Sequence, residues 1–144
     1  MISILQEFSS FESLINENLK PIQLIAEAKQ QPTDRQAVFL VVGTDAEELN
    51  RTLVHRKRSY QLIFYAEDMY KAMELHAKVD ALFTETGSLA CEDRFIKMQD
   101  HSMSRVFKTD SGLHSFLCMV EASYTISRTF EVVPKMANVT SAFY

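Results

Sequence analysis

The chain is poor in glycine: Gly43, Gly87 and Gly112 are the only three in 144 residues, and they lie far apart. A phosphate-binding loop needs clustered glycines, because its backbone N–H groups must approach the anion closely. The scattered glycines therefore argue against nucleotide binding through a loop of that kind.

Cysteine is also scarce, since Cys91 and Cys118 are the only two. Two thiols do not make a disulfide framework. We expect both to be reduced, with Cys118 serving as a small buried hydrophobe.

The chain does not begin with a basic region followed by an apolar run, and its longest apolar run, 38–42, is far too short to span a membrane. These features predict a soluble cytoplasmic protein.

Positive charge is in the minority, because the net charge is −4 and the isoelectric point lies near 5.5. Dedicated nucleic-acid binders usually carry a basic face and a high isoelectric point.

No histidine pair has the i, i+4 spacing of a helical zinc site. His101 and His114, facing each other across a hairpin, are the best metal candidate, although ordinary surface histidines are the favoured interpretation. No catalytic, cofactor-binding or metal-binding residue is predicted.

Periodic apolar positions predict two helices. The first covers about 3–19, and Pro21 ends it because proline removes a backbone donor. The second covers 68–83, with Asp68 as its N-cap and Gly87 as its stop signal. Its expected buried stripe comprises Met69, Ala72, Met73, Leu75, Val79, Leu82 and Phe83.

Alternating or β-branched segments predict strands at 22–28, 37–43, 58–65 and 115–126, with a turn at 108–112. In the last strand, Phe116, Cys118, Val120, Ala122, Tyr124 and Ile126 are expected on one face. We therefore predict one α+β domain over 1–144. Its mostly antiparallel sheet is packed by one main central helix, 68–83, plus the N-terminal helix. An extended C-terminal tail begins at about residue 134.

One local feature stands out in this acidic chain. Arg51, His55, Arg56, Lys57 and Arg58 concentrate basic side chains within eight positions. Either this is a solvated hairpin turn, or it contacts a neighbouring subunit's acidic surface, a tube or passing nucleic-acid phosphates. The candidate contact residues are Arg51, Arg56, Lys57 and Arg58.

The order of elements resembles that of the tail terminator proteins of tailed phages and prophage-derived contractile particles. The resemblance rests on the arginine-led aromatic strand RKRSYQLIFY at 56–65, the helix that follows it, the long late strand LCMVEASYTI at 117–126 and the tail with Pro134, Lys135 and Met136. It covers roughly residue 56 to the end of the chain, and the first 55 residues more weakly.

The resemblance implies a structural protein without catalysis or cofactor. Such a protein forms a homo-hexameric ring, caps the tail tube, stops its polymerisation and joins it to the head–tail connector protein. Its location is then the bacterial host cytoplasm during assembly and later the tail or neck of the virion. DNA is only cargo passing through the lumen, and no membrane is involved.

Two other interpretations stay open. One is a head-completion, neck or minor tail protein, because these are also small, acidic and free of motifs. The other is a small ligand-binding module or enzyme, with a pocket beside the 68–83 helix and His101 and His114 nearby.

Overall fold

The computed structural model describes residues 4–26, 32–49, 52–92 and 94–127. Their strands form one sheet in the order β1-β2-β3-β7-β5-β4, with β6 also paired to β7. Every pairing is antiparallel except that of β1 with β2. The chain is therefore an α+β protein, as predicted. The elements are α1 (Ile4–Asn18), β1 (Gln23–Ile25), β2 (Gln36–Glu48), β3 (Leu53–Ala66), α2 (Met69–Glu85), β4 (Ser88–Cys91), β5 (Arg94–Met103), β6 (Phe107–Lys108) and β7 (His114–Ser127).

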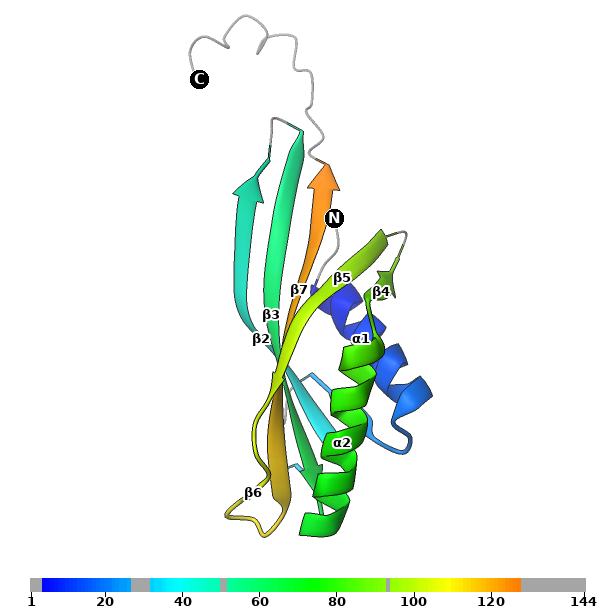
Figure 1. The fold of residues 1–144 in the computed structure, drawn as a ribbon, viewed down its shortest axis with the longest axis vertical. Helices are drawn as coiled ribbons and strands as arrows, with labels where there is room; N and C mark the ends of the chain where they lie inside the picture. Colours follow the sequence, from blue (N-terminus) through cyan, green and yellow to red (C-terminus); the bar gives the residue numbers. More distant parts are fainter. Residues whose placement is uncertain (1–3, 27–31, 50–51, 93, 128–144) are drawn as a thin grey trace, which may run out of the picture.

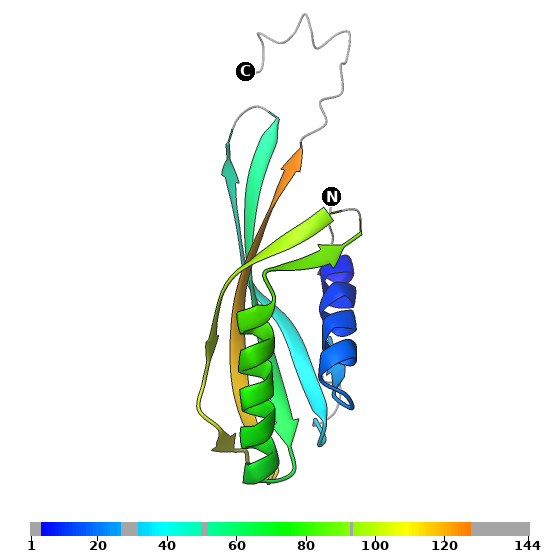
Figure 2. The same cartoon turned by 45° about the vertical axis from the view of Figure 1, so that its right-hand side comes forward.

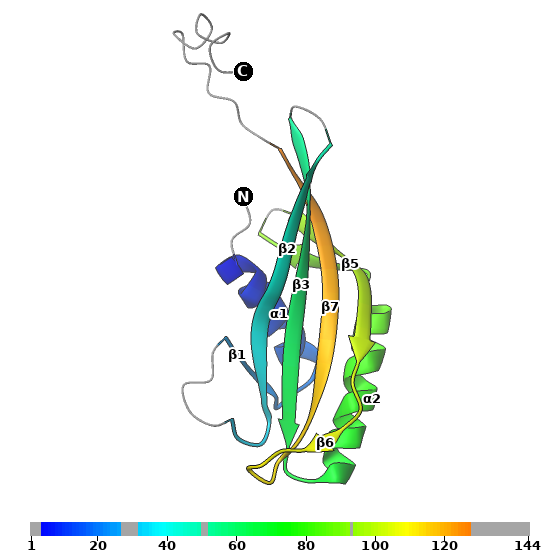
Figure 3. The same ribbon diagram turned by 90° about the vertical axis from the view of Figure 1, so that its left-hand side faces the viewer.

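Both described helices lie against the same face of the curved sheet, and no described helix covers its other face (Figure 3). From α1, Phe11 and Ile15 are fully buried, and α2 buries Val79 and Phe83. The two helices are 15 and 17 residues long and both reach the core. The description of α2 as one main central helix is therefore not confirmed.

The long central strands β3 and β7 each supply five buried apolar residues of the core. On β7, the predicted alternation is confirmed for Phe116, Cys118, Val120, Ala122 and Tyr124, which are all buried; the side chain of Ile126 lies outside the described part. On β3, Tyr60, Leu62 and Phe64 are buried in the same way. Apolar side chains at alternate positions thus fix which face of the sheet receives the helices.

The second helix begins as predicted, because Asp68 Oδ1 accepts a hydrogen bond of 2.7 Å from the Lys71 backbone N–H. It ends at Glu85, just before the predicted stop at Gly87. Its buried face is narrower than predicted, since Met69 and Met73 are 42% and 59% exposed.

The hairpin of β2 and β3 is longer than the sequence predicts. Strand β2 continues past a bulge between Val41 and Gly43, and β3 already begins at Leu53. The basic residues at 55–58 therefore lie inside a strand, so the interpretation as a solvated hairpin turn is wrong.

The predicted tail from residue 134 lies outside the described residues. Among the described helices, none is long and apolar enough to cross a membrane.

Candidate interaction surface

Three strands run together at one end of the sheet as an arm, which we define as 43–48 of β2, 53–58 of β3 and 122–127 of β7. Figures 1 and 2 show these strands continuing beyond both helices. Every residue of β2 from Val42 to Glu48 is exposed. Strand β2 is therefore exposed to solvent along the whole length of the arm.

The outer side of β2 is an open sheet edge. Within the described chain, only β1 pairs there, and its contact stops at Val38. The Leu49 N–H donates to the Leu53 carbonyl at 3.0 Å. This bond shows which residues of β2 direct their backbone groups toward β3 and which direct them outward. Because alternate residues of an antiparallel pair face their partner, the backbone groups of Thr44, Ala46 and Glu48 point outward.

The two strands of this hairpin carry opposite charges. Asp45 lies directly across from Lys57, and Glu47 lies across from His55, on the sheet face without helices. Directly opposed side chains of an antiparallel pair are close enough to interact, and opposite charges there are favourable. The same chain thus places acidic residues directly across from part of the basic cluster.

The structure separates the four predicted contact residues. Lys57 is exposed and Arg56 is half-buried, whereas Arg58 is only 5% exposed and faces the helices. Arg51 lies outside the described residues. Only Lys57 and Arg56 therefore retain surface that a partner can reach, and Arg58 has an internal role.

That internal role is a charged cluster at the base of the arm. Glu7, in the first turn of α1, is fully buried, and its Oε2 lies 3.2 Å from Arg58 Nη1. The Tyr60 hydroxyl donates to Glu7 Oε1, and the Tyr124 hydroxyl donates to Oε2 at 3.3 Å. One carboxylate thus joins α1 to both central strands of the sheet.

The two phenols stay protonated in this environment. Burial raises the pKa of Tyr60, and the hydrogen bond to Glu7 and its charge raise it further. Burial also raises the pKa of Tyr124, with the charge of Glu7 acting in the same direction and Arg58 against it. Arg58 Nε is buried without a hydrogen-bond acceptor, and the geometry of Nη1 toward Glu7 is that of an ion pair and not of a hydrogen bond.

Sequence reasoning missed Glu7 because it counted only apolar residues on the first helix. Ile4 and Leu5, apolar residues at the start of the predicted helix, are 51% and 73% exposed. Glu7 precedes Phe11 by four residues, which places both on one side of a helix. That i, i+4 relation was the available signal.

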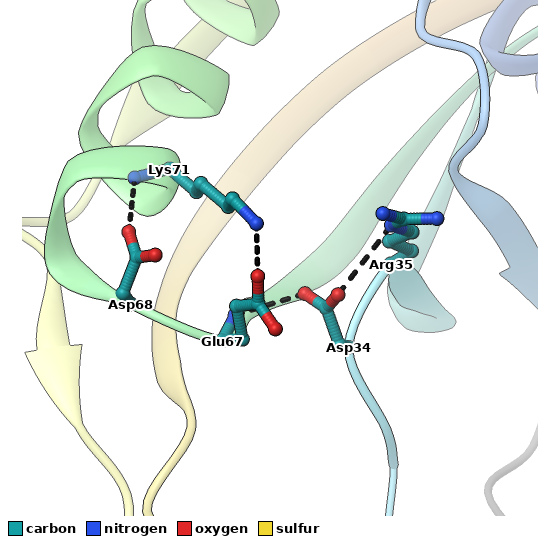
Figure 4. Close-up of polar contacts among 5 residues, drawn as sticks. All are labelled: Asp34, Arg35, Glu67, Asp68 and Lys71. Atoms are coloured by element: carbon teal, nitrogen blue, oxygen red, sulfur yellow. Dashed lines mark hydrogen bonds and ion pairs between the residues drawn. The ribbon is translucent and has the colours of Figure 1, made fainter.

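The opposite end of the molecule has a hollow of about 260 Å³ between α2, the end of β3 and the loop before β2. Figure 4 shows the charged residues beside it: Asp34 Oδ1 accepts from the Glu67 backbone N–H at 2.8 Å, Asp34 Oδ2 lies 3.4 Å from Arg35, and Lys71 pairs with Glu67. Lys78, in the hollow's lining, pairs with Glu74 at 3.7 Å. Lys20, from the segment that follows α1, also lines the hollow and has no ion pair among the described residues. Because the other three cations already have acidic partners, the hollow is not a strong anion site.

The histidine candidate for a metal site is wrong. His101 pairs in register with Val120, six residues along β7 from His114, a separation of roughly 20 Å. His101 Nε2 instead lies 2.8 Å from Asp80 Oδ1, joining β5 to α2. Among the described residues, no group of three or more histidine, cysteine or acidic side chains is arranged to hold a metal.

Both thiols are buried. Burial raises the pKa of Cys118 to about 12, which agrees with the prediction of a small hydrophobe. The pKa of Cys91 is also raised, mainly by burial and less by the charges of Glu7 and Glu92, while a hydrogen bond with Ser10 acts against this. Neither environment favours a reactive thiolate.

The chain matches no protein-family model and no curated protein sequence. Its fold is similar to that of a solved protein whose name states no function, with a TM-score of 0.50 and 12% sequence identity. The similarity covers 91% of this chain and 99% of that one. At this identity the likeness concerns the fold alone.

Proposed function

We propose that this protein is a structural assembly protein, a phage or prophage tail terminator. It forms a hexameric ring on the end of the tail tube, stops tube polymerisation and presents a surface to the head–tail connector. Its role is to bind other subunits and not to catalyse a reaction. It acts in the host cytoplasm during assembly and then in the tail or neck of the virion.

The observation that carries the proposal is the arm with its open edge. A closed ring needs two different complementary surfaces on each subunit. An unpaired strand edge suits strand addition by a neighbouring chain. Strand β2 offers that edge next to exposed charges, while the sheet ends at its other side in the short β4. The sequence resemblance to tail terminators adds a specific identity to this general assembly role.

A head-completion, neck or minor tail protein would use similar features, and the tube experiment below separates it from a terminator. The ligand-binding alternative has weaker support, because Asp34 and Lys71, beside the described hollow, already pair with Arg35 and Glu67.

The direct test adds purified protein to polymerising tail tubes and measures tube lengths by electron microscopy. We expect shorter tubes with a distinct ring at one end. Tubes of unchanged length with unmodified ends would contradict the terminator assignment.

A variant of the arm tests where the contact lies. Arg56→Ser with Lys57→Ser should weaken capping, because both side chains lie on the arm and reach its surface. Arg58 must be retained, since its removal would leave Glu7 without its buried cation. The matched control is Lys78→Ser with Lys108→Ser, which removes the same charge from exposed positions outside the arm. Equal capping by both variants would exclude the basic stretch from the contact.

A further inference from the structure

The outer edge of β2 has a defined binding chemistry. Thr44 and Ala46 present their backbone N–H and C=O groups outward, as a partner strand requires. Strand β2 contains three acids, Asp45, Glu47 and Glu48, and no basic residue. Charged side chains on an edge oppose pairing with an unsuitable strand. A strand that binds here should therefore carry little negative charge.

The same chain contains a segment of suitable composition. Residues 128–144 follow Ser127, which pairs with Leu53 at the far end of the arm. Seventeen residues can span at most about 56–61 Å when extended. The sequence TFEVV at 129–133 is rich in β-branched and aromatic residues. The segment has two basic residues, Arg128 and Lys135, and one acid, Glu131.

We propose that residues 128–144 of one copy of the chain add as a strand to the outer edge of β2 in a second copy. Each copy then gives a segment and receives one, which is a heterologous contact able to close into a ring. The choice of a second copy over the chain's own edge rests on the proposed function. The open edge, its acidic side chains and the composition of the segment do not depend on the proposed function.

One full-length variant blocks the receiving edge. Ala46→Pro removes an N–H that points away from β3, so the hairpin ladder should persist. Ala46→Val keeps the N–H and is the matched control. We expect loss of all species larger than the monomer for Ala46→Pro in light scattering, with the unfolding transition unchanged, and normal assembly for Ala46→Val.

A second full-length variant blocks the donated segment. Val132→Pro with Val133→Pro changes adjacent positions, so one of them faces the partner in either register. Its control is Val132→Ile with Val133→Ile. The Val132→Pro with Val133→Pro variant, unlike its isoleucine control, should also lose all species larger than the monomer.

Mixing the two proline variants is the decisive experiment. The edge-blocked chain still has a donor segment, and the donor-blocked chain still has an open edge. An equimolar mixture should therefore give two-chain species and nothing larger. Any one of three results would overturn the proposal. The first is assembly of either proline variant alone as in the wild type. The others are a mixture that stays monomeric and a wild-type chain that is monomeric throughout.

The tube assay separates this proposal from the proposed function. If both proline variants cap tubes as the wild type does, strand exchange is overturned and the terminator function stands. If the wild type does not affect tubes, the terminator function is overturned, and the mixing result still decides strand exchange.

Discussion

The two halves of β2 differ in what their side chains do. In the half that the helices cover, Ala37, Val38 and Phe39 are buried. In the arm, beyond the bulge at Gly43, every side chain through Glu48 is exposed. One strand thus contributes apolar packing at one end and a charged, unpaired edge at the other. The part of the molecule that the helices cover, which we call the body, holds the apolar core, while the arm is the part that we propose binds a partner.

The boundary between the two regions lies at the buried cluster of Glu7, Arg58, Tyr60 and Tyr124. A buried ion pair is weak evidence for net stability, but loss of one partner is costly because the other charge stays buried. The cluster ties the start of α1 to the sheet where the arm begins. Variants of it should disturb the body, and variants of the outer arm should not.

The largest effect is expected from Glu7→Ala. Arg58 would remain in the interior without its carboxylate, so the free energy of unfolding should fall by about 3–5 kcal/mol. Glu17→Ala, at an exposed position of α1, is the control and should change it by no more than about 0.5 kcal/mol. Denaturant unfolding measures both. Equal stability of the two variants would show that the cluster does not hold the body together.

An intermediate effect is expected at alkaline pH. The pKa values of Tyr60 and Tyr124 are raised in the folded state, so the fold binds their protons more tightly than the unfolded chain does. Their contribution to stability is complete below about pH 10, the ordinary tyrosine pKa, and is lost as the pH rises above it.

Tyr60→Phe should therefore flatten the fall in stability above pH 10. Part of the slope should remain, because the pKa values of Tyr65, Cys91 and Cys118 are also raised. Tyr70→Phe, at a residue 76% exposed, is the control. Unfolding midpoints between about pH 8 and about pH 11, on both sides of the ordinary tyrosine pKa of about 10, give the comparison. An unchanged slope for Tyr60→Phe would contradict the assignment.

The smallest effect is expected from Lys57→Glu on the arm. It places like charges across from Asp45, and the cost should be about 0.2–1 kcal/mol. The double change Lys57→Glu with Asp45→Lys exchanges the two charges and should recover most of that loss. Denaturant unfolding of the single and double variants tests it. If the double variant is no more stable than the single one, the opposed charges do not interact.

The sequence predicts the body better than the arm. Both helices, the inward face of β7 and the N-cap at Asp68 follow from apolar periodicity and local capping chemistry, which act over a few residues. The edges of the apolar stripes were less predictable. Met69 and Met73 have the right spacing, yet they stay exposed on the side of the helix near Arg105 and Val106, while Ala72 of the same turn is buried.

The arm and the buried cluster could not be read from local patterns. The basic residues at 55–58 look like a polar turn, because the acids that oppose them are about ten residues away along the chain and meet them only through strand register. The pairing of Glu7 with Arg58 joins residues fifty-one positions apart in the same way (58 minus 7). Long-range pairing is set by the register of the whole sheet.

The account is tested most directly by residue-resolved amide hydrogen exchange of the monomer and of the protein assembled on tubes. The amides of Thr44 and Ala46 should exchange rapidly in the monomer and become strongly protected on assembly, because a partner strand then accepts their hydrogen bonds. The amides of Tyr60 and Leu62, already paired within the sheet, should be protected in both states. If the two outward amides exchange at the same rate in both states, the edge of the arm does not bind a partner.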